Sequence, residues 1–179
     1  DNCFNELSKE WGSLDFVVHA LAFSDKSELS GRFINTSRQN FLNSLDISCF
    51  SLIDISKRCS PLMNSGGAIL TLSYLGSQRV TPNYNVMGVA KAALESSVRY
   101  LASDLGEDGI RVNAISAGPM KTLAGAAIGG ARRVFRISEQ NSPLKSNPTL
   151  KSVGGTAAFL LSDYGMHVSG EVIFVDGGY

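Results

Sequence analysis

Two side chains in this sequence could together polarise a carbonyl group: the phenol of Tyr84 and the ammonium of Lys91. At about 3.6 residues per helical turn, their seven-residue spacing places them on nearly the same helix face, with Met87 between them. A nearby positive charge favours the phenolate, so Lys91 would make the Tyr84 hydroxyl a better hydrogen-bond or proton donor. Lys91 would also keep donors for the hydroxyls of a sugar. By spacing alone an ordinary surface pair is the commoner explanation, so neighbouring motifs have to support the pair.

A second phenol precedes Tyr84 by ten residues, in the segment Leu72-Ser73-Tyr74-Leu75-Gly76. This segment ends an apolar run typical of a buried strand, so Tyr74 would lie at the carboxyl end of that strand. Both phenols could therefore face one cleft. An ordinary aromatic residue at a strand end explains Tyr74 equally well.

Two later segments place turn residues after a strand. Within Asn113 to Thr122 a strand ends in Gly118-Pro119, which would leave backbone amides and the Thr122 hydroxyl available to a ligand, although a simple turn explains the segment as well. Val175-Asp176-Gly177-Gly178 follows the last apolar run, and by itself it is explained by turn residues that bound a strand.

The elements that must position these residues alternate along the chain. Strands are predicted at 14–20, 67–73, 110–115 and 171–175, and helices at about 4–11, 39–59, 84–105 and 151–161. Parallel neighbouring strands need crossover connections, so this order favours an α/β fold, a Rossmann-like doubly wound parallel sheet with helices on both faces. No repeat or low-complexity linker appears, so residues 1–179 are predicted to form a single domain. In such sheets a ligand site lies beyond the carboxyl ends of the strands.

Composition excludes several classes of protein. Sixteen basic and sixteen acidic residues balance, which gives no reason to expect a nucleic-acid or anionic-membrane partner. The apolar runs are far shorter than the roughly 20 residues of a membrane-spanning helix. The three cysteines form no Cys-x-x-Cys pair and fit buried thiols in a reducing cytoplasm. The two histidines, His19 and His167, lie in no ligand-spaced cluster, so structural roles and no metal site are predicted.

Taken together, the motifs resemble those of bacterial NADH-dependent enoyl-(acyl carrier protein) reductases, a branch of the short-chain dehydrogenase/reductase superfamily. Most other members of that superfamily have Tyr at the position of Met87 and an Asn-Ala-Gly turn in place of His19-Ala20-Leu21-Ala22. The matching segments occur in family order and cover essentially the whole chain; they are Val18 to Phe23, Leu72 to Gly76, Asn83 to Gly88 with Lys91, Asn113 to Thr122, and Val175 to Gly178.

The resemblance implies a set of site residues. As catalytic residues it implies Tyr84, which donates a hydrogen bond to a trans-2-enoyl thioester carbonyl, with Lys91 on the nicotinamide ribose and Tyr74 as a secondary contributor. Its cofactor-binding residues are His19, Ala20, Leu21, Ala22, Leu72, Lys91, Gly118, Pro119, Met120 and Thr122. Its substrate-binding residues are Tyr74, Tyr84, Met87, Ala124 and Ile128. Ala22 stands where the family often has Gly.

The stretch from Leu123 to Arg136 is rich in Ala and Gly and resembles the mobile substrate-binding loop of the family. Its pattern alone fits a surface-exposed helix equally well. The resemblance also implies NADH as cofactor, with NADPH not excluded, an acyl carrier protein that carries the enoyl chain as partner, and a homotetramer of the full-length enzyme.

The resemblance begins in the helix before the fourth strand of the family pattern, and the chain has no initiator Met. We therefore expect a sheet that lacks its first three strands, exposes one face of the strand at 14–20, and alone binds cofactor weakly. Two alternatives remain: another member of the superfamily that acts on a 3-oxoacyl or alcohol substrate, or an inactive truncated remnant.

Overall fold

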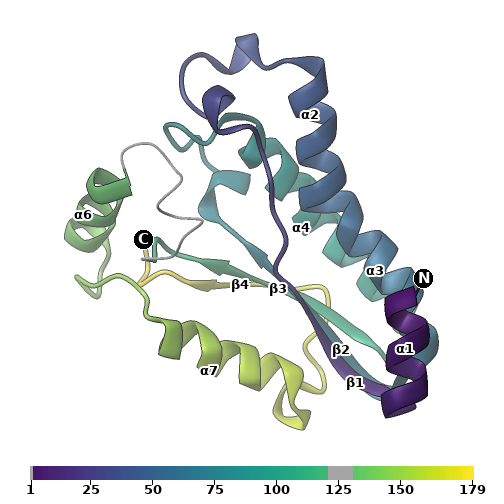
Figure 1. Cartoon of the computed structure of the whole chain (residues 1–179). Helices are drawn as coiled ribbons and strands as arrows, with labels where there is room; N and C mark the ends of the chain where they lie inside the picture. The colour runs from purple at the N-terminus through teal and green to yellow at the C-terminus, as the bar shows by residue number, and fades with distance from the viewer. Residues whose placement is uncertain (1, 121–130) are drawn as a thin grey trace.

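The computed structural model describes residues 2–120 and 131–179, which form a parallel sheet between two layers of helices (Figure 1). Its strands are β1 (Leu14–His19), β2 (Met63–Ser73), β3 (Arg111–Ala117) and β4 (Val172–Val175). They are hydrogen-bonded in the order β1-β2-β3-β4, and every pairing is parallel. The predicted α/β fold and its parallel sheet are confirmed.

Consecutive side chains of a strand point to opposite faces of the sheet. On β2, Ile69 packs on one face and Leu70 on the other, and on β3 Val112 and Ile115 divide in the same way. All four side chains are at most 1% exposed. Helices therefore cover both faces of the central strands, as the nearly continuous apolar runs of β2 and β3 predict.

One face is covered by α3 (Ser51–Cys59) and α4 (Asn85–Leu105), with Phe4 of α1 (Asn2–Trp11) at its margin. The long helix α4 places an apolar side chain against the sheet every three or four residues, as its sequence spacing predicts. We call the resulting cluster the α4-side core; its buried members are Leu14, Cys49, Leu52, Cys59, Ile69, Leu94, Val98, Ile110, Val112 and Ala114.

The opposite face is covered by α7 (Leu150–Leu161), whose Val153 and Leu160 pack on the sheet. Thr149 caps the start of α7: its hydroxyl accepts a hydrogen bond from the Ser152 amide, and the Ser152 hydroxyl accepts one from the Thr149 amide. Arg111 at the start of β3 secures the other end, because its Nη1 donates to the Leu160 carbonyl at 2.6 Å.

The predicted helix at 39–59 forms, but in three segments. α2 (Arg38–Leu45) and α3 are joined by a π-helical segment, η3 (Asp46–Phe50), without a break in the chain of helical turns. Pro61 lies in the short 3-10 turn that follows, as expected of a residue that cannot continue a helix. The remaining 3-10 turns are η1 (Lys26–Glu28), η2 (Phe33–Asn35), η4 (Ser60–Leu62), η5 (Leu75–Ser77) and η6 (Asp163–Gly165).

Two boundaries differ from the prediction. β2 begins four residues earlier than its apolar run, because Met63 pairs with Leu14 of β1 across an irregular register. Residues 131–136, predicted as part of a loop, belong to the helix α6 (Ala131–Asn141), which lies beside the carboxyl ends of the strands. The predicted loop residues 123–130 lie outside the described residues.

β1 exposes one of its faces, as the sequence predicted. The side chains of Phe16 and Val18 are 53% and 48% exposed, whereas Leu14 and His19 are buried.

Among the described helices, none is long and apolar enough to cross a membrane. Residues 2–120 and 131–179 also contain no group of three or more His, Cys, Asp or Glu side chains placed to hold a metal ion.

Candidate active site

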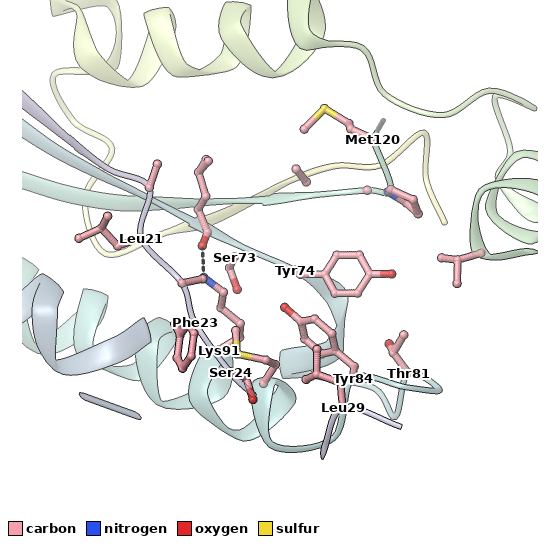
Figure 2. A pocket seen from close by; sticks show the side chains of 18 of the residues that line it. Leu21, Phe23, Ser24, Leu29, Ser73, Tyr74, Thr81, Tyr84, Lys91 and Met120 are labelled. Carbon is pink, nitrogen blue, oxygen red and sulfur yellow. Dashed lines mark hydrogen bonds between the residues drawn. The ribbon is translucent and has the colours of Figure 1, made fainter. Parts of the chain in front are cut away.

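A cavity of about 540 Å³ opens at the carboxyl ends of β1, β2 and β3 (Figure 2). This volume lies within the range of small-molecule sites, roughly 300–1,000 Å³. Parallel strands bring the segments that follow them to one edge of the sheet, which is where the sequence predicted the site. The lining residues are Ala20 to Ser24, Leu29, Leu72 to Tyr74, Thr81, Tyr84, Met87, Lys91, Ala117 to Met120, Val134 and Phe135.

Tyr84 lies at the start of α4 and is only 7% exposed. Its neighbours Asn83 and Asn85 both adopt positive φ angles, 59° and 36°, so the chain makes a tight turn that directs the phenol toward the cavity. Asn85 holds this turn from outside, because its Nδ2 donates to the Glu28 carbonyl at 2.9 Å.

Tyr74 meets Tyr84 inside the cavity. The two ring centroids are 5.0 Å apart and the ring planes are inclined by 63°, an edge-to-face contact. Leu29 and Met87 pack around the pair and complete an apolar wall. The prediction that both phenols face one cleft is confirmed.

Gly76 makes this packing possible. A Cβ on Gly76 would overlap the Tyr84 ring at Cδ1 and Cε1, and a Cβ on Gly88 would lie 2.7 Å from the Gly76 carbonyl oxygen. The turn after β2 therefore packs directly on α4 and on the Tyr84 ring, with no room for a larger residue at either glycine.

Lys91 lies on the same side of α4 as Tyr84 and is 6% exposed. Its Nζ donates to the Leu72 carbonyl at 2.8 Å (Figure 2), and this one bond leaves two ammonium donors for a ligand. Burial lowers the pKa of Lys91 to about 8, while Cys49 and Glu95 act in the opposite direction. Lys91 therefore changes charge close to neutral pH.

The effect predicted for Lys91 on the phenol is wrong for this arrangement. The pKa of Tyr84 lies above its ordinary value, because burial and then the charges of Tyr74 and Glu95 disfavour the phenolate. Burial also raises the pKa of Tyr74. Tyr84 consequently remains a neutral hydroxyl, a hydrogen-bond donor, over the whole neutral range.

His19 lies beneath the cavity and is not among its lining residues. Its Nε2 lies 2.8 Å from the Ser51 hydroxyl, which itself donates to the Ile47 carbonyl. Its Nδ1 lies 2.9 Å from the Thr71 hydroxyl. Burial, followed by the charge of Lys91, lowers the pKa of His19 to about 4. The neutral ring is thus a buried structural link between β1, β2 and α3, and the cofactor contact predicted for His19 stays a prediction.

Most of the other residues predicted to bind cofactor or substrate line the cavity. The cavity is lined by Ala20, Leu21, Ala22, Leu72, Gly118, Pro119, Met120, Tyr74, Tyr84 and Met87. Met120 lies across the cavity from Tyr84 (Figure 2). Thr122, Ala124 and Ile128 lie outside the described residues.

Sequence reasoning missed several lining residues. Ser24 and Leu29 come from the loop after β1 and Thr81 from the turn before α4, whereas Val134 and Phe135 of α6 fall within the stretch 123–136 that was predicted to bind substrate. Loop residues carry no periodic signal, so only the folded chain shows that these side chains meet. Glu95 was also missed, although its position one helical turn after Lys91 was a usable signal.

Comparison with known proteins gives the family. The family model described as enoyl-(acyl carrier protein) reductase matches residues 1–179. The NADH-dependent enoyl-(acyl carrier protein) reductase FabI of Rickettsia conorii is 53% identical over 178 residues, which are 99% of this chain and 68% of the relative.

Two solved structures are similar in fold and sequence. The Anaplasma phagocytophilum reductase in complex with NAD has a TM-score of 0.94 and 56% identity, over 99% of this chain and 66% of that one. The Bacillus cereus enoyl-acyl carrier protein reductase with NADP+ and an indole naphthyridinone has a TM-score of 0.97 and 49% identity, over 99% and 69%. This chain spans about two thirds of the length of these proteins, and it belongs to the enoyl-(acyl carrier protein) reductase family.

Proposed function

We propose that this chain carries the catalytic and acyl-binding part of an enzyme that reduces the 2,3 double bond of a trans-2-enoyl group on acyl carrier protein, with NADH. The observation that carries the proposal is the convergence of the Tyr84 hydroxyl and the Lys91 ammonium on one apolar cavity. Family membership and the names of the relatives support the same reaction. We further propose that residues 1–179 form one domain.

The residues at the carboxyl ends of the strands fit a nicotinamide cofactor. Lys91 has two donors to offer to ribose hydroxyls, and the segments 20–22 and 118–120 bring backbone groups to the same edge. We propose that these residues, with Leu72, and with Thr122 beyond the described residues, hold the nicotinamide half. When bound, such a cofactor supplies the hydride. The relatives' names favour NADH, while one similar structure holds NADP+.

Tyr84 is proposed to donate a hydrogen bond to the thioester carbonyl oxygen of the enoyl group. Negative charge grows on that oxygen as the enolate forms, and a donor already aimed at it stabilises the transition state by about 3 kcal/mol. The raised pKa of Tyr84 supports this role, because the hydroxyl retains its proton. The apolar surroundings strengthen the bond by excluding water.

Tyr74, Met87 and Leu29 are proposed to hold the acyl chain. Together with Tyr84 they form one hydrophobic cluster. Most of the superfamily has a Tyr at the position of Met87, close to the Lys, and a phenol there would suit a ketone or alcohol substrate. Ala124 and Ile128 remain proposed contacts beyond the described residues.

α6 is proposed to lie next to the acyl carrier protein. Its Val134 and Phe135 line the cavity, while Arg132, Arg133 and Arg136 are exposed on the same helix. Such a basic surface favours an anionic carrier.

A homotetramer that buries the outer faces of α3 and α4 is also proposed, and half-exposed Phe50 on that side supports it. A cytoplasmic location is proposed from the thiols and the absence of a spanning helix among the described residues.

The proposal is tested by comparing two substrates with the complete protein. We expect NADH to be consumed with a crotonyl or longer 2-enoyl thioester and not with a 3-oxoacyl thioester of the same chain length. Consumption of NADH with the 3-oxoacyl thioester alone would replace this function by that of a ketone reductase.

A further inference from the structure

Glu95 is a buried carboxylate that the reaction described above does not use. It lies on α4, one helical turn after Lys91, and is only 5% exposed. Its Oε1 accepts hydrogen bonds from the hydroxyls of Ser73 and Ser77, each at 2.5 Å. Such short distances are typical of hydroxyls bonded to an ionised carboxylate, whose hydrogen bonds are about twice as strong as neutral ones.

The two serines bound the turn that carries Tyr74. Ser73 ends β2, and Ser77 ends the 3-10 turn η5. The backbone amide of Ser77 also donates to the Tyr74 carbonyl at 3.0 Å. A single carboxylate oxygen on α4 therefore holds both ends of the five-residue segment 73–77. Ser73 and Tyr74 themselves line the cavity.

Lys91 holds the residue before this segment. Its Nζ is bonded to the Leu72 carbonyl, so two consecutive turns of α4 grip the end of β2 with opposite charges. On the far side of the turn, Gly76 presses on the Tyr84 ring. The position of Tyr74 relative to Tyr84 thus depends on where α4 holds residues 72–77.

We propose that Glu95 is a positioning residue of this site: its carboxylate clamps the turn at 73–77 and so fixes Tyr74 edge-on against Tyr84. The inference rests on the proposed function, and it adds a residue that acts through others without touching the substrate. The clamp also places a negative charge beside Lys91, which keeps the ammonium charged in a buried place.

The charge of Glu95 has a measurable electrostatic effect. It raises the pKa of Lys91 against the effect of burial, and it raises the pKa of Tyr84. The other ionisable groups that face Lys91 are Cys49 of η3 and His19 of β1, and His19 is neutral above about pH 4. Removal of the Glu95 charge therefore lowers the pKa of both the ammonium and the phenol.

The test compares Glu95→Gln with Asp104→Asn in the complete protein. Both substitutions turn a carboxylate of α4 into an amide, but Asp104 is exposed. We expect Glu95→Gln to reduce kcat for 2-enoyl reduction about tenfold through misplacement of the tyrosines. It should also move the alkaline limb of the pH profile to lower pH, a shift that loss of packing alone would not produce. Asp104→Asn should change neither.

A second variant and a second measurement keep the outcome decisive. Ser77→Ala removes one of the two bonds to Glu95, leaves its charge, and should give a smaller fall in kcat with no shift of the alkaline limb. Hydrogen–deuterium exchange across residues 73–78 should be faster in Glu95→Gln than in Asp104→Asn, and this holds even if the protein reduced no enoyl thioester. An unchanged exchange rate together with an unchanged alkaline limb would overturn the proposal.

Discussion

Leu94 and Glu95 are neighbours on α4, yet they belong to opposite kinds of interior. Leu94 is completely buried in the α4-side core, whose side chains are hydrophobic. Glu95 belongs to a polar layer under the cavity, with His19, Tyr84 and Lys91, all of them nearly buried. Burial stabilises the first region, and in the second it displaces the pKa values of His19, Tyr84 and Lys91. One helix, α4, thus anchors the fold with one set of side chains and positions the candidate active site with another.

The largest expected effect lies in the apolar region. Leu94→Ala should lower the free energy of unfolding by about 3 kcal/mol, since it removes buried methyl groups and leaves a cavity. The matched change Leu144→Ala, at a position 74% exposed, should cost almost nothing. Both are measured by chemical denaturation of the complete protein. Equal losses in the two variants would show that the α4-side core does not stabilise the protein as described.

A loss of similar size, but one that depends on pH, is expected in the polar layer. The pKa of His19 falls from 6.5 to about 4 on folding, so the unfolded state binds the proton more readily. The stability contributed by the neutral ring is complete above pH 6.5 and is lost as the pH falls towards 4, by about 3 kcal/mol.

Denaturation at several pH values checks this dependence. His19→Gln should remove it, because an amide does not titrate, whereas the exposed His167→Gln should retain the wild-type dependence. A wild-type profile that matches His19→Gln between pH 6.5 and 4 would contradict the assignment.

Lys91→Met should separate activity from stability. We expect kcat/KM to fall about a hundredfold, since a charge that orients the reacting groups is lost. The free energy of unfolding should change by no more than about 1 kcal/mol, because a buried charge is replaced by an apolar side chain of similar length.

The pH profile provides the control for Lys91. In the wild type, kcat/KM should decline as the pH rises through about 8, where the buried ammonium loses its proton. Lys91→Arg keeps a charge that does not titrate in this range and should retain activity to higher pH. An alkaline limb that is identical in both proteins would assign the decline to another group.

The smallest effect is expected at Tyr74. Tyr74→Phe keeps the ring that packs edge-on against Tyr84 and removes only the hydroxyl, so we expect a fall in kcat of roughly threefold or less. Tyr74→Ala, which removes the ring, should cost considerably more. Equal effects of the two would mean that the hydroxyl, and not the ring, is the part that matters.

Much of the fold could be predicted from the sequence. The run at 67–73 is mostly apolar, as is typical of a strand covered on both faces, and α4 repeats its apolar positions every three or four residues. The early start of β2 at Met63 could not be predicted, because Asn64, Ser65 and Gly66 carry no strand pattern and Met63 pairs with Leu14 of β1 only across an irregular register.

The site was predictable where it depends on single elements and not where it depends on their contacts. The spacing of Tyr84 and Lys91 on one helix, and the strand ends that surround them, follow from local periodicity. The clamp by Glu95, the ring of His19 committed to Ser51 and Thr71, and the raised pKa of Tyr84 all arise from side chains far apart in sequence. Only the folded chain reveals them.

The Tyr84 hydroxyl is proposed to stabilise the enolate of a 2-enoyl thioester, and Tyr84→Phe in the complete protein is the most direct test of that role. Because the ring and its packing remain, the free energy of unfolding should hardly change, while kcat for a crotonyl or longer 2-enoyl thioester should fall a hundredfold or more, by about 3 kcal/mol in activation free energy. Turnover equal to that of the wild type would remove Tyr84 from its proposed role.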